Sequence, residues 1–100
     1  MNEYLKIRWL HEDPAYPVLL LSELDQDRRE VRKIEVYADG RCEFAAAEGR
    51  TGSAELGDVP VPAVEEIAAD PHFVVEDTSA ADFERLWATS GLALVESGKD

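Results

Sequence analysis

Cysteine is almost absent from this 100-residue chain, and its one cysteine, Cys42, has no partner for an internal disulfide. The sequence therefore excludes an internally disulfide-bonded scaffold and predicts a reducing, cytoplasmic compartment. Long apolar runs are also absent, because the longest aliphatic run, residues 18–21, is far too short to cross a bilayer. Residues 1–5 lack the basic and apolar regions of a signal peptide. We therefore expect no contact with a membrane.

Motifs for catalysis and cofactor binding are missing as well. The chain has no Gly-x-Ser-x-Gly elbow, no phosphate-binding glycine loop, and neither a Cys-x-x-Cys nor a His-x-x-His pair. Cys42 lies on the same side of an alternating segment as Phe44, which favours core packing over a nucleophilic role. The sequence thus predicts no catalytic, cofactor-binding or metal-binding residue, and a protein that is not an enzyme.

Basic residues are scarce, and the resulting charge is uneven. Ten Lys and Arg stand against 22 Asp and Glu, which gives a net charge of −12. Residues 1–42 hold seven basic and nine acidic side chains, a balance of −2, whereas residues 43–100 hold three and thirteen, a balance of −10. Such a surface repels nucleic acid and anionic lipid and attracts a basic protein partner. The same acidity also serves solubility alone, and this simpler interpretation stays open.

Alternation of apolar and polar residues dominates the first half of the chain and predicts strands. Prolines at both ends of residues 14–17 interrupt the pattern and predict a loop. Aspartates in residues 24–28 favour a tight turn, and Asp39-Gly40 is a hairpin signal because glycine accepts positive φ. The expected sheet is a four-stranded antiparallel meander of residues 4–11, 18–24, 29–37 and 41–46.

Helical spacing of apolar residues appears only in the second half, after a small, polar loop at residues 48–57. One stripe consists of Val64, Ile67 and Ala68, and the other, which follows the candidate N-cap Ser79, consists of Phe83, Leu86 and Trp87. Residues 72–76 are interpreted as an extended connection or a small edge strand. We expect one α+β domain over residues 1–100, ordered from about 3 to 90, with two short helices packed on one face of the sheet and residues 96–100 frayed.

Five segments carry a recognisable pattern: WLH at 9–11, SELD at 22–25, VRKIEVY at 31–37 followed by Asp39-Gly40, PAVEEI at 62–67 and FERLW at 83–87. Together they resemble a family of small bacterial proteins catalogued as a domain of unknown function. The resemblance covers residues 3–88, most of the chain, and implies no activity, cofactor or catalytic residue. Members of similar size and acidity are suspected to be immunity proteins that neutralise toxins, so the resemblance implies an immunity-like role.

The functional prediction is a non-enzymatic protein-interaction module that binds a basic partner. Tyr16 is a candidate contact because it lies between two prolines in a rigid loop, which lowers the entropy lost on binding. The oligomeric state stays open. The full candidate surface comprises one aromatic residue and six charged ones: Tyr16, Arg28, Arg29, Glu65, Glu66, Glu76 and Asp77.

An alternative prediction is a small metal-dependent enzyme or small-molecule-binding domain with a site near His11, Glu12 and Asp13. There an imidazole adjoins two carboxylates, and His72 is a further candidate ligand. Successive strand residues point to opposite faces, however, so His11 and Glu12 chelate together only if the loop bends sharply. A pocket between sheet and helices is a third possibility.

Arg32 is the basic residue for which the pattern makes the sharpest structural prediction. It shares a strand face with Ile34 and Val36, so it should be partly buried and needs an acidic partner. The expected partner is Glu23, across the hairpin, or an acid from the second half of the chain. The charged hairpin either fixes the register of the strands or forms a charged rim for a ligand.

Overall fold

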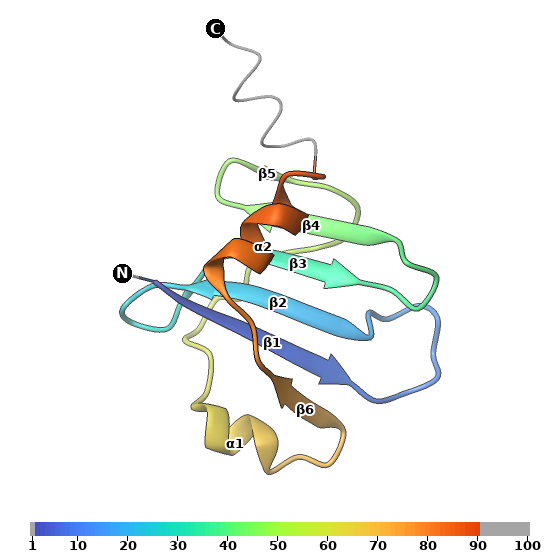
Figure 1. Ribbon diagram of the computed structural model, residues 1–100, viewed down its shortest axis with the longest axis vertical. Helices are drawn as coiled ribbons and strands as arrows, with labels where there is room; N and C mark the ends of the chain where they lie inside the picture. Colours follow the sequence, from blue (N-terminus) through green and yellow to red (C-terminus); the bar gives the residue numbers. More distant parts are fainter. Residues whose placement is uncertain (1, 91–100) are drawn as a thin grey trace, which may run out of the picture.

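The computed structural model describes residues 2–90, which form a six-stranded antiparallel sheet and two helices (Figure 1). The strand order is β5-β4-β3-β2-β1-β6, and every neighbouring pair is antiparallel. The strands are β1 Glu3–Trp9, β2 Leu19–Leu24, β3 Glu30–Val36, β4 Cys42–Ala46, β5 Gly49–Arg50 and β6 Phe73–Glu76. The helices are α1 Val64–Ala68 and α2 Ala80–Trp87.

The prediction of four strands was wrong, because two further strands extend the meander. β1 to β4 pair consecutively as expected, including β2 with β3. β5 adds two residues beside the end of β4, and β6 pairs with the outer side of β1. The interpretation of residues 72–76 as a small edge strand is thus confirmed. A two-residue ladder is too short to show a period, and β6 finds its partner more than 60 residues back in the chain, so local alternation does not report either pairing.

Both predicted turns are confirmed, and side chains hold them in place. In the turn between β2 and β3, Asp25 Oδ1 accepts hydrogen bonds from the backbone N–H groups of Asp27 (2.9 Å) and Arg29 (3.0 Å). In the next turn Gly40 has φ +92° and donates its N–H to the carbonyl of Tyr37 at 2.9 Å. This positive φ is a conformation that glycine adopts without strain.

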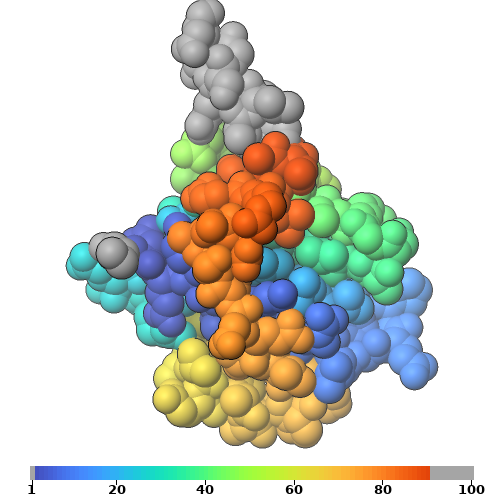
Figure 2. Space-filling view, in the orientation of Figure 1, coloured from blue at the N-terminus to red at the C-terminus, as the bar shows by residue number. Residues whose placement is uncertain are grey.

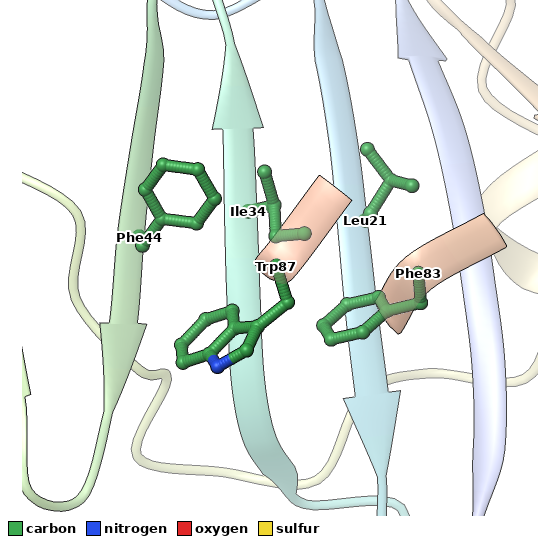
Figure 3. Packing of buried hydrophobic residues seen from close by; sticks show 5 residues of the cluster. All are labelled: Leu21, Ile34, Phe44, Phe83 and Trp87. Carbon is green, nitrogen blue, oxygen red and sulfur yellow. The ribbon is translucent and has the colours of Figure 1, made fainter. Parts of the chain in front are cut away.

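One face of the sheet is covered by α2, which lies across the front of the strands in the space-filling view (Figure 2). The predicted cap is confirmed, because Ser79 Oγ accepts a hydrogen bond from the N–H of Asp82 at 3.1 Å. Phe83 and Trp87 point from α2 into the sheet (Figure 3). There they pack against one residue from each of the three central strands: Leu21, Ile34 and Phe44.

The two helices do not pack on one face, so that part of the expected architecture was wrong. Leu20 and Leu21 are successive residues of β2 and point to opposite faces. Leu21 contacts the α2 cluster, whereas Leu20 faces a groove that Ile67 of α1 also lines. Figure 1 shows α1 displaced toward the β6 edge of the sheet. With five residues and no buried side chain, α1 has too little apolar surface to cover a whole face.

Residues 51–62 cover much of the face opposite α2. Ala54 is fully buried there, and Leu5, Leu24 and Ala45 are buried strand residues that require such a cover. Neither helix of residues 2–90 has the length and apolarity needed to span a membrane. The predicted fraying of residues 96–100 lies outside the described residues.

Candidate functional site

An apolar groove of about 380 Å³ lies between the sheet and α1, on the face opposite α2. We call it the α1 groove. Its floor is formed by side chains of β1 and β2, and its walls by the segment before α1, by α1 itself and by the start of β6. The residues that line it are Ile7, Leu20, Val61, Pro62, Glu66, Ile67, Asp70 and Phe73. Six of them are apolar, two are acidic and none is basic, so the lining favours an apolar group that carries a positive charge beside it.

Arg28 holds the wall of the α1 groove in place. It lies in the β2–β3 turn with φ +61°, and its guanidinium donates to the carbonyls of Val61 (3.1 Å) and Pro62 (2.8 Å). The same guanidinium pairs with Glu3 at 2.7 Å, and the Arg28 carbonyl accepts the N–H of Val61 at 2.7 Å. Arg29 donates to the carbonyl of Asp58 at 3.0 Å. Arg28 and Arg29, both candidate contacts for a partner, therefore position the loop that leads into α1.

Acidic side chains form the α1 side of the groove. Glu65 and Glu66 are exposed in the first turn of α1, and neither carboxylate has a hydrogen-bond or ion-pair partner within residues 2–90. Only Glu66 of the two lines the groove. The backbone N–H and the ring of His72 hydrogen-bond the Asp70 carboxylate (2.9 and 3.0 Å) and lower its pKa. Glu66 and Asp70 thus place negative charge beside an apolar floor.

A second source of negative charge adjoins the floor of the groove. The register places Ile7, Leu20, Glu35 and Glu43 opposite one another in a row across β1 to β4, on the same face. Glu43 is well satisfied, because it accepts hydrogen bonds from the Tyr37 hydroxyl (3.1 Å) and from Ser53 N–H and Oγ (3.0 Å each). Within residues 2–90, the only ion-pair partner of Glu35 is Lys33, at 4.0 Å. Glu35 is therefore the less compensated acid beside Leu20.

Replacing Glu35 by glutamine is expected to stabilise the protein at neutral pH. Burial raises the pKa of the Glu35 carboxyl; the charge of Lys33 opposes this shift, and the charges of Glu43 and Glu30 add to it. Because the folded-state pKa lies above the unfolded value, the native state binds the proton more tightly, and stability is lost as the pH rises through the folded-state pKa. We therefore expect Glu35→Gln to raise the free energy of unfolding at pH 7.

Denaturant unfolding at several pH values checks this expectation. The gain should disappear below the ordinary glutamate pKa of 4.5, where both side chains are neutral. Glu43→Gln is the matched control and should destabilise, because hydrogen bonds from Ser53 and Tyr37 outweigh burial and lower the pKa of Glu43. Destabilisation by Glu35→Gln at pH 7, or a change of the same sign for both variants, would contradict this account of the acid row.

The structure does not bring the seven candidate contact residues together. Glu76 pairs with Arg8 (2.7 Å) and Lys6 (3.6 Å) on the face that carries α2. Asp77 is exposed just after β6. Tyr16 is 53% exposed, and its ring lies 5.7 Å from that of Trp9, between centroids. Of the predicted set, only Glu66 lines the α1 groove. Whether any of the seven contacts a partner stays a prediction.

The alternative site around His11 has a different geometry from a metal centre. His11 Nε2 donates to the carbonyl of Pro17 at 2.8 Å, while Nδ1 accepts the N–H of Asp13 at 3.0 Å. A metal ion would have to displace one of these hydrogen bonds, which fix the loop. Within residues 2–90 no group of three or more His, Cys, Asp and Glu side chains is placed to hold a metal ion. An open depression of about 590 Å³ lies alongside, lined by residues 8–12 and Val18.

The prediction for Arg32 is confirmed, and both expected kinds of partner are used. Its Nε donates to Glu23 Oε1 at 2.5 Å, and its two terminal nitrogens bind both carboxylate oxygens of Glu84 in α2. The guanidinium also lies over the rings of Phe83 (4.9 Å) and Trp87 (5.0 Å). These contacts hold α2 on the sheet, so this charged cluster serves the fold.

The electrostatics of this cluster agree with a structural role. The hydrogen bond with Glu84 raises the pKa of Arg32, even though burial opposes the shift. Burial alone would raise the pKa of Glu23, but hydrogen bonds from Asn2 and Arg32 outweigh it and lower that pKa. Both groups therefore stay charged and paired in the folded protein.

The α1 groove is the feature that sequence reasoning missed. A pocket between sheet and helices was considered, but no residues were assigned to it. Two signals were present in the sequence. Residues 19–21 are apolar on both faces of β2, whereas the predicted fold covers only one face of the sheet. Val61 is an apolar residue just before α1 for which the sequence predicts no contact. Both signals indicate that a second segment packs on the other face of the sheet.

The fold and the groove define a small antiparallel α+β domain with an acid-rimmed apolar groove. The family model described as Domain of unknown function (DUF6881) matches residues 3–92, and the chain belongs to this family. The resemblance seen in the sequence is thereby confirmed. Searches of the curated proteins and of the solved structures returned no match.

Proposed function

We propose that this protein is a non-enzymatic interaction domain that binds a basic protein partner, in the manner of an immunity protein. The observation that carries the proposal is the acidic rim of the α1 groove, where Glu66 has no cationic partner within the described residues. The balance of −10 in residues 43–100 supplies the long-range attraction. Attraction of this kind raises association rates and selects against partners of like charge.

Several basic side chains are paired with groups away from α1, which supports the same proposal. Arg28 is engaged with Glu3 and two carbonyls, and Arg32 with Glu23 and Glu84. Lys33 pairs with Glu30 at 3.3 Å and donates to the carbonyl of Glu55. None of these cations neutralises the acids of α1. Within residues 2–90 the two glutamates of α1 are therefore left without a cationic partner.

The test is affinity capture from a lysate of the source cells with the immobilised protein. We expect basic proteins to be retained at low ionic strength and released as salt rises, because electrostatic association is screened. A variant in which Glu65, Glu66 and Asp70 are all replaced by lysine should lose them. Capture of no basic protein, or retention indifferent to salt and to the charge reversal, would contradict the proposal.

A further inference from the structure

The α1 groove has the volume and the lining of a ligand-binding site. Its volume of about 380 Å³ falls within the range of ligand pockets in proteins. Ile7, Leu20 and Ile67 line it and are only partly buried, and no side chain of α1 is fully buried. A helix whose apolar stripe is only partly buried leaves room for a further apolar group. The floor therefore suits a large aliphatic or aromatic side chain.

Charge decides between the possible occupants. Glu66 and Asp70 flank the apolar floor on the α1 side, and Glu35 lies next to Leu20 on the sheet side. No basic residue of the described part of the chain, residues 2–90, lines the groove. An anionic or nucleic-acid ligand would be repelled, and a second copy of this chain carries the same net charge of −12. A cationic occupant gains from every acid around the groove.

We infer that the α1 groove receives a basic amphipathic segment of the partner protein, which inserts one large apolar side chain against Ile7, Leu20 and Ile67. A lysine or arginine beside that side chain meets Glu66 and Asp70. The inference rests on the proposed function and names the surface that carries it. It also explains why two acids stand at the entrance of an otherwise apolar groove, since burial of the apolar group excludes water and strengthens the charge contact.

Three synthetic 12-residue peptides test the inference: one of lysine and leucine, one of lysine and serine, and one of glutamate and leucine. Isothermal titration calorimetry at fixed ionic strength measures each affinity. We expect saturable binding of the lysine-leucine peptide, at least about tenfold weaker binding of the lysine-serine peptide, and none of the glutamate-leucine peptide.

Two variants of α1 locate the site with a matched control. Glu66→Lys and Glu65→Lys change the net charge equally, but only Glu66 lines the groove. We expect Glu66→Lys to weaken the lysine-leucine peptide by at least about tenfold and Glu65→Lys by less than about threefold. Ile67→Ser should also weaken it. Because Glu65 and Glu66 are exposed, the two charge variants should keep the melting temperature of the native protein, which thermal unfolding checks.

The outcomes separate the inference from the proposed function. Equal weakening by Glu65→Lys and Glu66→Lys, or equal affinity for the two lysine peptides, overturns the groove as the site and leaves a general attraction for basic partners. Absence of binding by both lysine peptides overturns the groove and the proposed function together.

Discussion

Arg32→Ala is expected to lower the free energy of unfolding by about 3–5 kcal/mol, because removal of one partner from a buried ion pair leaves the other charge without compensation. Glu23 is 8% exposed and, among residues 2–90, would keep only Asn2 and the longer contact with the Tyr4 hydroxyl. The variant also removes the contact between the sheet and Glu84 of α2. A loss of this size is a large fraction of the stability of a 100-residue domain. Denaturant unfolding followed by fluorescence measures it.

Arg85→Ala is the matched control for this prediction. Arg85 pairs with Asp82 at 3.0 Å, but both side chains are more than half exposed. Exposed ion pairs contribute at most about 1 kcal/mol, so this variant should change stability little. A loss for Arg32→Ala no greater than the loss for Arg85→Ala would contradict the view that Arg32 holds α2 on the sheet.

Phe83→Ala is the second variant for which we expect a loss of about 3–5 kcal/mol. The Phe83 side chain is 0% exposed and is among the largest that are fully buried. Its ring stacks against Trp87, with centroids 6.1 Å apart, and lies 5.4 Å from the ring of Tyr4. Truncation leaves a cavity between α2 and the sheet that the rigid strands cannot close. Thermal and denaturant unfolding give the change in stability.

Phe73→Ala provides the comparison on the opposite face. Phe73 begins β6, lines the α1 groove and is only partly buried. Its truncation enlarges a groove that is already open, so we expect a smaller loss of about 1–2 kcal/mol. Equal losses for Phe73→Ala and Phe83→Ala would contradict the assignment of the principal core to the α2 face.

Much of the fold follows from local patterns in the sequence. Alternation placed β1 to β4, and turn chemistry at Asp25 and Gly40 placed the reversals between them. The apolar stripe after Ser79 identified α2 and its buried face. Each of these features depends on neighbours within a few residues, which a periodicity resolves.

The features that escaped prediction depend on contacts between distant segments. β6 pairs with β1, and Arg28 reaches the carbonyls of Val61 and Pro62 more than 30 residues away. The position of α1 follows from those contacts, since its own five residues supply little packing. The α1 groove exists only where these segments meet, so no local pattern encodes it.

For Cys42 and Arg32, the strand face predicted from the sequence determines the electrostatic environment of the side chain as well as its packing. Cys42 packs beside the α2 cluster, as its place next to Phe44 predicted, and burial raises the pKa of its thiol. Arg32, on the same face, forms ion pairs with Glu23 and Glu84. On this account the face under α2 holds the principal core, and the opposite face offers the α1 groove to a partner beside the cover formed by residues 51–62.

The two tryptophans allow this division to be tested in one measurement. Trp9 lies on the groove face, with its ring 6.1 Å from that of Phe73 between centroids, whereas Trp87 is buried under α2. In a ¹⁵N-labelled sample each indole N–H gives one NMR signal, assigned with Trp9→Phe and Trp87→Phe variants. On titration with the lysine-leucine peptide, we predict that the Trp9 signal shifts and the Trp87 signal stays in place. A shift of Trp87 alone, or binding that moves neither signal, would contradict the account.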